Sequence, residues 1–483
     1  MGQSVITREI QVAPGRFAPG HLGELTQQVP FEMVDAVLAQ TGAVQSRIRV
    51  LPARVVVYLL LAGCLFAELG YGQVWHRLVA GLDGLAVAHP SPAALTQARR
   101  RLGAAPLRAL FDLLRGPAAV PGAAAGVRWR GLLVCAIDGT IMTVADSPAN
   151  LAVFTKQRGG PTGGSSYPML RLVALVSCGT RSVIDAVFGP ITSGETSYAA
   201  QLLASLHPGM IVLADRNFGA GPLAAQIAAA PAQFLIRVRT DRTGPKLPAL
   251  HRHRDGTYCS RFGGVPVRVI DAQITIATKA GRATTGSRLI TTLAGPHRYP
   301  AGELVTLYHQ RWDIETAYCE LKSTILGGRV LRARTPGGVH QEACALLVTY
   351  QILRTAMADA TTTQPGTDPD RASFTLARHA ARDQLVQAAG VTASPTIDLA
   401  GNIGRRLLAN PMPGRRLRVS PRTIKRAISK YNARGPTTNR ATHQATITIG
   451  LTAHTGLTTS GVNRPGESGD SFCCQPTSAR TAF

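Results

Sequence analysis

Two strongly apolar runs in the middle of the chain each end in an aspartate. The run LLVCAI precedes Asp138, and the run MIVLA precedes Asp215. Short apolar runs of this kind predict buried strands of a sheet that is covered on both faces. A carboxylate at the end of such a strand lies at the edge of the core, where burial is costly without a partner. We therefore expect both side chains at the carboxyl edge of an α/β sheet, where open sheets form their sites.

The chemistry of these two aspartates depends on whether their strands are neighbours. If the strands are adjacent and parallel, the carboxylates of Asp138 and Asp215 meet at one point and repel each other. A divalent cation removes that repulsion, and hard oxygen ligands favour Mg²⁺ or Mn²⁺. Either aspartate alone is a weak signal, because helix caps and turns also place aspartates after strands. A structural role for each therefore stays open at this point.

The order of the surrounding elements indicates a mixed sheet flanked by helices. After the first apolar run, two strand-like segments surround a turn at Gly179-Thr180, and helices then alternate with two further strands up to about residue 239. Residues 240–287 alternate apolar and polar side chains between Gly and Pro turns. This last pattern predicts a β-rich insertion.

Residues 20–116 have helical spacing broken by Pro and Gly, and a Gly/Ala/Pro-rich linker follows. Within them, PSPAALTQARRRLG predicts a helix that presents Arg99 and Arg100. Such a helix could enter a DNA groove, or it could be a surface helix with a solvated basic end.

The charge balance favours a polyanionic partner. The chain has 52 Lys and Arg against 27 Asp and Glu, a net charge of +25, which suits nucleic acid. A solubilising surface with one basic tail is the alternative. The eight cysteines lack metal-site spacing, which is typical of free thiols in a reducing cytosol. The apolar run at residues 55–67 is too short to cross a bilayer, and the N-terminus lacks the apolar core of a signal peptide.

A helix predicted over residues 301–326 carries an unusual stripe. At about 100° per residue, Tyr308, Arg311, Glu315 and Lys322 fall within roughly 60° of one face. The stripe could be a solvated row of ion pairs, because Arg311 and Glu315 are four residues apart. Trp312 lies near the same face, where it could stack on a base or pack against the protein.

The pattern Y-x2-R-x3-E-x6-K formed by these four residues resembles the motif of DDE transposases of the insertion-sequence-four family. IDGT around Asp138 and LADRNFG around Asp215 resemble that family's first and second acidic motifs, and the β-rich insertion before the third acid is also similar. The resemblance extends over about residues 20–390.

This resemblance implies a ribonuclease-H-like catalytic core in which Asp138, Asp215 and Glu315 are catalytic and hold two Mg²⁺ ions, with Mn²⁺ as a possible substitute. It implies that Tyr308, Arg311 and Lys322 hold DNA phosphates near the cleaved end. We add further candidate DNA contacts, which are Arg216, Asn217, Trp312, Arg99 and Arg100. The implied partners are double-stranded DNA, as element ends and target, and a second copy in a homodimeric synaptic complex. No membrane partner is expected, and the expected location is the cytoplasm, in association with the nucleoid.

The sequence therefore predicts a transposase that binds the terminal inverted repeats of its mobile element and catalyses Mg²⁺-dependent strand cleavage and strand transfer. Two alternatives are a nuclease of the same fold without strand transfer and a catalytically silent DNA-binding remnant. The predicted divisions are a helical DNA-binding domain at 1–116, a linker at 117–130, a catalytic domain at 131–358 with the insertion at 240–287, a basic region at 359–435 for DNA contact or dimerisation, and a disordered tail at 436–483.

Overall fold

The computed structural model describes most of the chain between residues 11 and 452. The described residues are 11–12, 16–17, 20–47, 50–82, 86–118, 127–158, 164–165, 167–279, 281–364, 366–387, 400–414, 418–419 and 443–452. Much of the expected linker (residues 119–126), part of the expected basic region (residues 388–399, 415–417 and 420–435) and most of the expected tail (residues 436–442 and 453–483) lie outside them.

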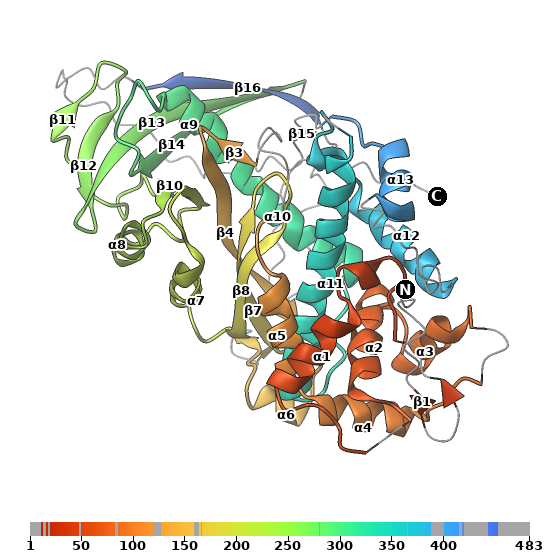
Figure 1. Cartoon of the computed structure of the whole chain (residues 1–483). Coiled ribbons are helices and arrows are strands. Elements are labelled where there is room, and N and C mark those ends of the chain that lie inside the picture. The colour runs from red at the N-terminus through yellow and green to blue at the C-terminus, as the bar shows by residue number, and fades with distance from the viewer. Residues whose placement is uncertain are drawn as a thin grey trace.

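A mixed sheet forms the centre of the molecule (Figure 1). The strand order is β8-β7-β4-β9-β10, in which β4, β9 and β10 are parallel and β7 is antiparallel to both of its neighbours, β4 and β8. The turn at Gly179, with φ of 82°, confirms the expected hairpin. This order and these directions confirm the expected ribonuclease-H-like fold. The strands are β4 (Leu132–Thr143), β7 (Met169–Ser177), β8 (Val183–Pro190), β9 (Met210–Ala214) and β10 (Gln233–Val238).

The β-rich insertion extends this sheet beyond β10, so that it shares one continuous ladder with the central strands (Figure 1). Its strands, in order from β10 outward, are β14 (Gly281–Thr291), β13 (Val265–Thr278), β12 (Tyr258–Phe262) and β11 (His251–Arg252). Strand β16 (His443–Leu451) pairs with the outer half of β13. The sequence predicts a disordered tail there, but the alternation of Ile and Thr in ATITIGL suits a strand. The minor strands are β1 (Gln11–Val12), β2 (Arg16–Phe17), β3 (Arg128–Trp129), β5 (Gln157–Arg158), β6 (Gly164–Ser165) and β15 (Arg418–Val419).

Helices cover both faces of the central strands, as their near-continuous apolar sequences require. Alternate side chains of each strand enter two separate cores. One core lies under α7 (Glu195–Gln201) and α8 (Gly221–Ala229). The other lies under the site helix described below and α11 (Pro336–Thr362).

The N-terminal helices pack around α11 and share its core, as do α12 and α13. The apolar run expected to be a buried helix is α2, in which every residue except Arg54 is buried. Within the described part of the chain, no helix is long and apolar enough to cross a membrane. The helices are α1 (Phe31–Gln40), α2 (Ala53–Leu65), α3 (Tyr71–Val79), α4 (Pro92–Leu102), α5 (Ala105–Leu114), α6 (Pro148–Leu151), α12 (Phe374–Val386) and α13 (Gly401–Ala409), with 3₁₀ turns at Leu25–Gln27, Leu203–Ser205 and Pro369–Arg371.

The segment predicted as one helix over residues 301–326 is helical from residue 301 to residue 325, but its helix type changes several times along the segment. It consists of α9 (Ala301–Tyr308), a 3₁₀ turn (His309–Arg311), α10 (Trp312–Cys319) and a π-helical turn (Glu320–Ile325). It ends at Gly327 and Gly328, whose φ values of 61° and 71° are left-handed and suit glycine. We call the part from residue 308 to residue 325 the site helix.

Candidate active site at the carboxyl edge of the sheet

The two aspartates lie side by side at the carboxyl edge of the sheet. Strands β4 and β9 are parallel neighbours, and Ile137 pairs with Ala214 in their register. Asp215 is the first residue after β9, and Asp138 is the next residue of β4, which continues to Thr143 beside β7. The sequence prediction that Asp138 ends its strand is therefore wrong, although Asp138 lies next to the end of β9. The two strands thus meet the condition, adjacent and parallel, under which the two carboxylates come together.

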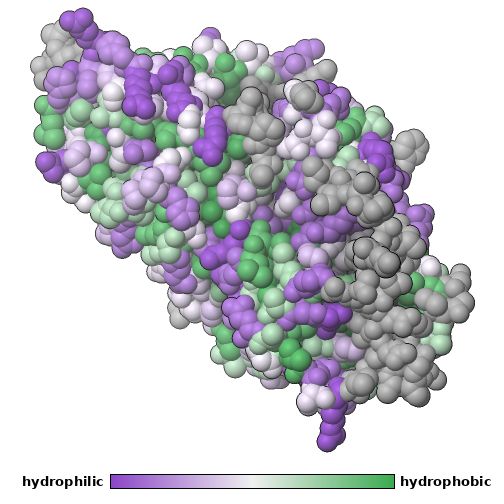
Figure 2. Space-filling view, viewed as in Figure 1, coloured by the Kyte–Doolittle hydropathy of each residue, from purple (hydrophilic) through white to green (hydrophobic). Residues whose placement is uncertain are grey.

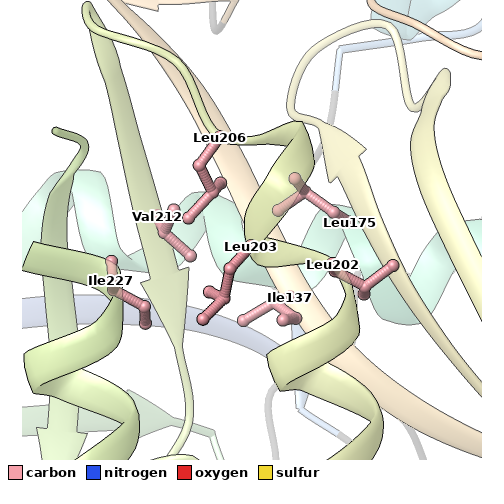
Figure 3. Close-up of a pocket in the computed structure, with 7 residues that line it drawn as sticks. All are labelled: Ile137, Leu175, Leu202, Leu203, Leu206, Val212 and Ile227. Carbon is pink, nitrogen blue, oxygen red and sulfur yellow. The ribbon is translucent and has the colours of Figure 1, made fainter. Parts of the chain in front are cut away.

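The backbone that carries Asp138 is fixed from both faces of the sheet. On one face, Ile137 contributes to a small pocket with aliphatic walls, formed with side chains that include Leu203 and Val212 (Figure 3). On the other face, the hydroxyl of Tyr318 donates a hydrogen bond of 2.6 Å to the carbonyl oxygen of Asp138. The pocket is a small gap between packed aliphatic side chains, and its walls offer no polar group to a ligand.

The Asp138 carboxylate is poorly solvated and strongly perturbed. Its side chain is 16% exposed, and burial raises its pKa to about 7, with further upward contributions from Asp215 and Glu315. The charge of Arg311 and the backbone N–H of Gly139, which donates at 2.7 Å, act in the opposite direction. A carboxyl group in this setting is held back from ionisation mainly by its loss of water and partly by neighbouring negative charge.

The stripe of the site helix faces the same two strands. Tyr308 donates to the carbonyl oxygen of Ala214 at 3.2 Å, and the Lys322 ammonium donates to Thr140 Oγ1 at 3.1 Å. Arg311 lies between two carboxylates. Its Nη1 is 3.3 Å from Asp138 Oδ2, and its Nη2 is 2.9 Å from Glu315 Oε1. The structure thus brings these helix residues to the edge where β9 ends.

The carboxylates offer oxygen ligands only, which suits a hard divalent cation. Asp215 is half-buried, and its Oδ1 accepts the backbone N–H of Asn217 at 2.7 Å. The Glu315 side chain is 32% exposed and keeps one oxygen outside its bond to Arg311. In the rotamers present, no three His, Cys, Asp or Glu side chains of the described residues lie close enough to hold a metal ion. The donor chemistry therefore fits a metal, whereas joint ligation requires the carboxylates to rotate toward one another.

The other candidate residues divide into two groups. Arg216 and Asn217 are exposed directly beside Asp215, and Trp312 is half-buried with its ring 5.1 Å from the Arg311 guanidinium carbon. These three belong to the same edge of the sheet.

Arg99 and Arg100 belong to α4, among the N-terminal helices. The Arg99 guanidinium lies 3.9 Å over the ring of Tyr71, and its carbonyl oxygen accepts from Gln341 at 3.0 Å, so Arg99 is part of the packing there. Arg100 is exposed. The recorded contacts of Arg99 join α4 to α3 and α11, and none joins it to the aspartates.

The structure places a fourth carboxylate near Asp138. Glu195, at the start of α7, lies against Gly139, and a Cβ added to that glycine would be 2.8 Å from Glu195 Oε1. In the sequence, Glu195 stands in SGETSY, a setting that suits an ordinary acidic residue at a helix N-terminus. The signal for the contact is the glycine that follows Asp138 directly in IDGT, since only a residue without a side chain admits Glu195 there.

Comparison with known families identifies the kind of site. Residues 19–112 match the family model "Insertion element 4 transposase N-terminal", and residues 129–352 match the family model "Transposase DDE domain". Together the two matches cover more than half of the chain. The chain belongs to the insertion-sequence-four family of DDE transposases. It is accordingly an enzyme that transposes DNA.

Individual relatives agree with this assignment. The chain is 26% identical over 414 residues to the transposase InsG for insertion sequence element IS4 of Escherichia coli strain K12, covering 83% of this chain and 91% of that protein. It is 30% identical over 195 residues to the putative transposase InsZ of the same strain, covering 40% of this chain and 62% of that protein. A solved structure, the piggyBac transposase synaptic complex with hairpin DNA, aligns with 73% of this chain and 76% of that chain, at 9% identity and a TM-score of 0.37. A likeness at that TM-score adds nothing to the assignment.

Proposed function

We propose that this transposase binds the terminal inverted repeats of its mobile element and catalyses Mg²⁺-dependent strand cleavage and strand transfer. We assign the catalytic, metal-holding role to Asp138, Asp215 and Glu315. The observation that carries the proposal is the register of β4 and β9, which sets the two aspartates side by side. Glu315 is joined to Asp138 through the single guanidinium of Arg311.

The role of the three carboxylates is to hold metal ions. Two bound Mg²⁺ ions, or Mn²⁺ in their place, supply activation of the attacking oxygen and charge stabilisation at the leaving oxygen. The raised pKa of Asp138 means that it gains more from a nearby cation than a solvated carboxylate would. The protein's own contribution is to hold the carboxylates at one edge and to keep the reacting phosphate aligned.

The helix cations are proposed to hold the DNA. Arg311 offers a planar fork that matches a phosphate, and Lys322 offers a point charge beside Thr140. A DNA phosphate would give Arg311 an anionic partner in place of Asp138 and Glu315, which would release both carboxylates for the metal ions. Tyr308 lies at the start of the same stripe.

Further DNA contacts are proposed around this edge and on two other surfaces. Arg216 and Asn217 are exposed beside the site, Trp312 can stack on a base, and Arg100 is exposed on α4. Arg99, the other candidate of α4, packs on Tyr71 and is not retained as a DNA contact. The insertion also presents a hydrophilic surface (Figure 2), and two of its acids, Asp255 and Asp271, are ion-paired with Arg268 and Arg288. Its exposed cations are Arg242, Lys246, Arg252, Arg254, Arg261, Lys279 and Arg282, and Arg239 and Arg298 are exposed just outside its bounds. Such a surface suits the phosphate backbone of element ends or target DNA.

The assembly and location follow from the same proposal. A transposase that joins two ends of one element works most simply as a homodimer in a synaptic complex. We propose that it does so in the cytoplasm, on DNA of the nucleoid.

The test is cleavage of a duplex that contains an element end. Asp138→Ala, Asp215→Ala and Glu315→Ala should each abolish strand cleavage while end binding stays nearly intact, because the fold does not depend on their charge. Asp146→Ala removes an exposed carboxylate that is paired with Lys156 and is the matched control. Normal cleavage by all three variants would refute the assignment. Joined products with a target plasmid distinguish a transposase from a nuclease that only hydrolyses DNA.

A further inference from the structure

The site helix has a second charged face, which enters the core. Asp313 and Glu320 lie about 140° to 160° around the helix from Glu315, and both are buried, at 7% exposure each. The stripe that faces the strand ends thus has a counterpart on the opposite side. The residues that receive this second face are Arg181, Arg354, Tyr350 and Asp370.

Arg181 comes from the turn between β7 and β8 and is held in an unusual backbone conformation. Its φ is 57°, in the left-handed region that favours glycine, and only 3% of its side chain is exposed. Its Nη1 is 2.7 Å from Glu320 Oε1, and its Nε is 3.7 Å from Asp313 Oδ1. Its Nη2 forms an ion pair with Asp370. A strained, buried arginine of this kind persists only where its surroundings fix it.

The turn around Arg181 makes a second contact with the helix. The backbone N–H of Gly179 donates to Asp313 Oδ2 at 2.9 Å. Both ends of α10 are therefore tied to one hairpin turn, Asp313 at its beginning and Glu320 directly after its end.

Glu320 is also held from α11. Its Oε2 accepts from the hydroxyl of Tyr350 at 3.0 Å and from the guanidinium of Arg354. Burial by itself would raise the pKa of Glu320, but the charges of Arg354 and Arg181 and their hydrogen bonds lower it below its usual value. The group is therefore an ionised carboxylate between two buried guanidinium groups.

The position of Glu320 decides which way the following turn faces. Glu320 begins the π-helical turn that contains Lys322, and a π turn adds one residue to a helical turn. Residues that follow are rotated relative to a regular α-helix, so the direction of Lys322 toward Thr140 depends on where Glu320 is held. Buried ion pairs are weak evidence for stability and can serve specificity instead.

We propose that Arg181, Glu320 and Arg354 form a clamp that fixes the rotation of the site helix, so that Glu315 and Lys322 face the edge that carries Asp138. The three are positioning residues, since none of them touches the reacting groups. The inference rests on the proposed function and adds to it a set of residues outside the four-residue motif.

The test compares Glu320→Gln with Glu342→Gln. Glu342 is a buried glutamate of α11. Like Glu320 it accepts a hydrogen bond from an arginine, in this case Arg332, but its hydrogen bonds go to residues 332 and 333 and not to the site helix. Both variants lose one buried charge, so both should lower the melting temperature. Only Glu320→Gln should also weaken Mn²⁺ binding, measured by electron paramagnetic resonance, and slow single-turnover cleavage, by about 10²-fold for a displacement of about 1 Å.

Each outcome separates the inference from the function on which it rests. Equal Mn²⁺ affinity and equal cleavage rates for the two variants, well below their melting temperatures, would overturn the clamp. In that case the proposed function still stands if Glu315→Ala is inactive. If Glu315→Ala cleaves normally, the proposed function itself is wrong.

Asp370→Asn is the second variant if Glu320→Gln does not fold. Asp370 is the more exposed member of the network, at 17% of its side chain, and it pairs with Arg181. It should show a smaller change in Mn²⁺ affinity of the same sign. A wild-type affinity and cleavage rate would count against the clamp.

Discussion

Asp138→Asn should make the folded protein more stable, and by an amount that grows with pH. Asparagine has nearly the same shape as a protonated aspartate and still offers an oxygen to the N–H of Gly139. In the wild type, burial above all raises the pKa of Asp138 from an ordinary value of 3.8 to about 7. A carboxyl whose pKa is raised on folding contributes most to stability at low pH, and that contribution is lost as the pH rises toward about 7.

The size of the effect follows from these two pKa values. The interval from 3.8 to about 7, at about 1.4 kcal/mol for each pH unit, amounts to about 4 kcal/mol at pH 8. At pH 5 the pH has risen only about one unit above 3.8, so the stability lost through Asp138 is about 1.5 kcal/mol. The advantage of Asp138→Asn over the wild type should therefore increase by about 3 kcal/mol between pH 5 and pH 8.

The assay is urea unfolding followed by tryptophan fluorescence at several pH values, without divalent ions. Asp146→Asn, at an exposed carboxylate, is the control and should show no such increase. A difference between Asp138→Asn and the wild type that is zero, or that stays constant from pH 5 to pH 8, would refute the reasoning. It would mean that Asp138 is solvated or already neutralised in the folded protein.

Two further predictions concern backbone space at the site and the N-terminal helices. Gly139→Ala should leave the protein folded and reduce cleavage only modestly, because its Cβ would meet the flexible end of Glu195, with Oε1 at 2.8 Å, and that carboxylate can turn aside; a loss as large as that of Asp138→Ala would show that Glu195 is needed where it lies. Arg100→Ala should weaken DNA binding and reduce the slope of log affinity against log salt by about 0.9, as measured by fluorescence anisotropy, with no change in melting temperature. Arg99→Ala should instead lower stability by about 1 to 2 kcal/mol, since its guanidinium stacks on a ring; unchanged DNA affinity and an unchanged salt slope for Arg100→Ala would exclude Arg100 as a DNA contact.

The sequence allowed prediction of the central strands and of the edge that they form. The runs before Asp138 and Asp215 are apolar enough to indicate burial on both faces, and burial on both faces implies a sheet with helices on each side. The apolar runs leave open whether the two strands are adjacent, and the register of Ile137 with Ala214 shows that they are. The stripe of Tyr308, Arg311, Glu315 and Lys322 could be predicted because these residues stay on one side of the site helix although its helix type changes.

The rest of the site depends on contacts between distant parts of the chain. Arg181 and Glu320 are 139 residues apart, so no local pattern announces that they meet. Their contact turns Glu320 into the core at the start of the π-helical turn, which periodicity alone treats as regular helix. The approach of Glu195 to Gly139 is likewise a matter of packing between α7 and β4, for which the sequence offers only the glycine.

The most direct test of the central claim is anomalous diffraction from crystals of the transposase bound to a cleaved element end in Mn²⁺. The account predicts a manganese peak within about 2.0 to 2.3 Å of carboxylate oxygens of both Asp138 and Asp215, with Glu315 as a further ligand and Arg311 on a DNA phosphate. Crystals of Asp215→Asn should lack this peak. Manganese bound elsewhere on an enzyme that cleaves DNA, with Arg311 still between Asp138 and Glu315, would contradict it.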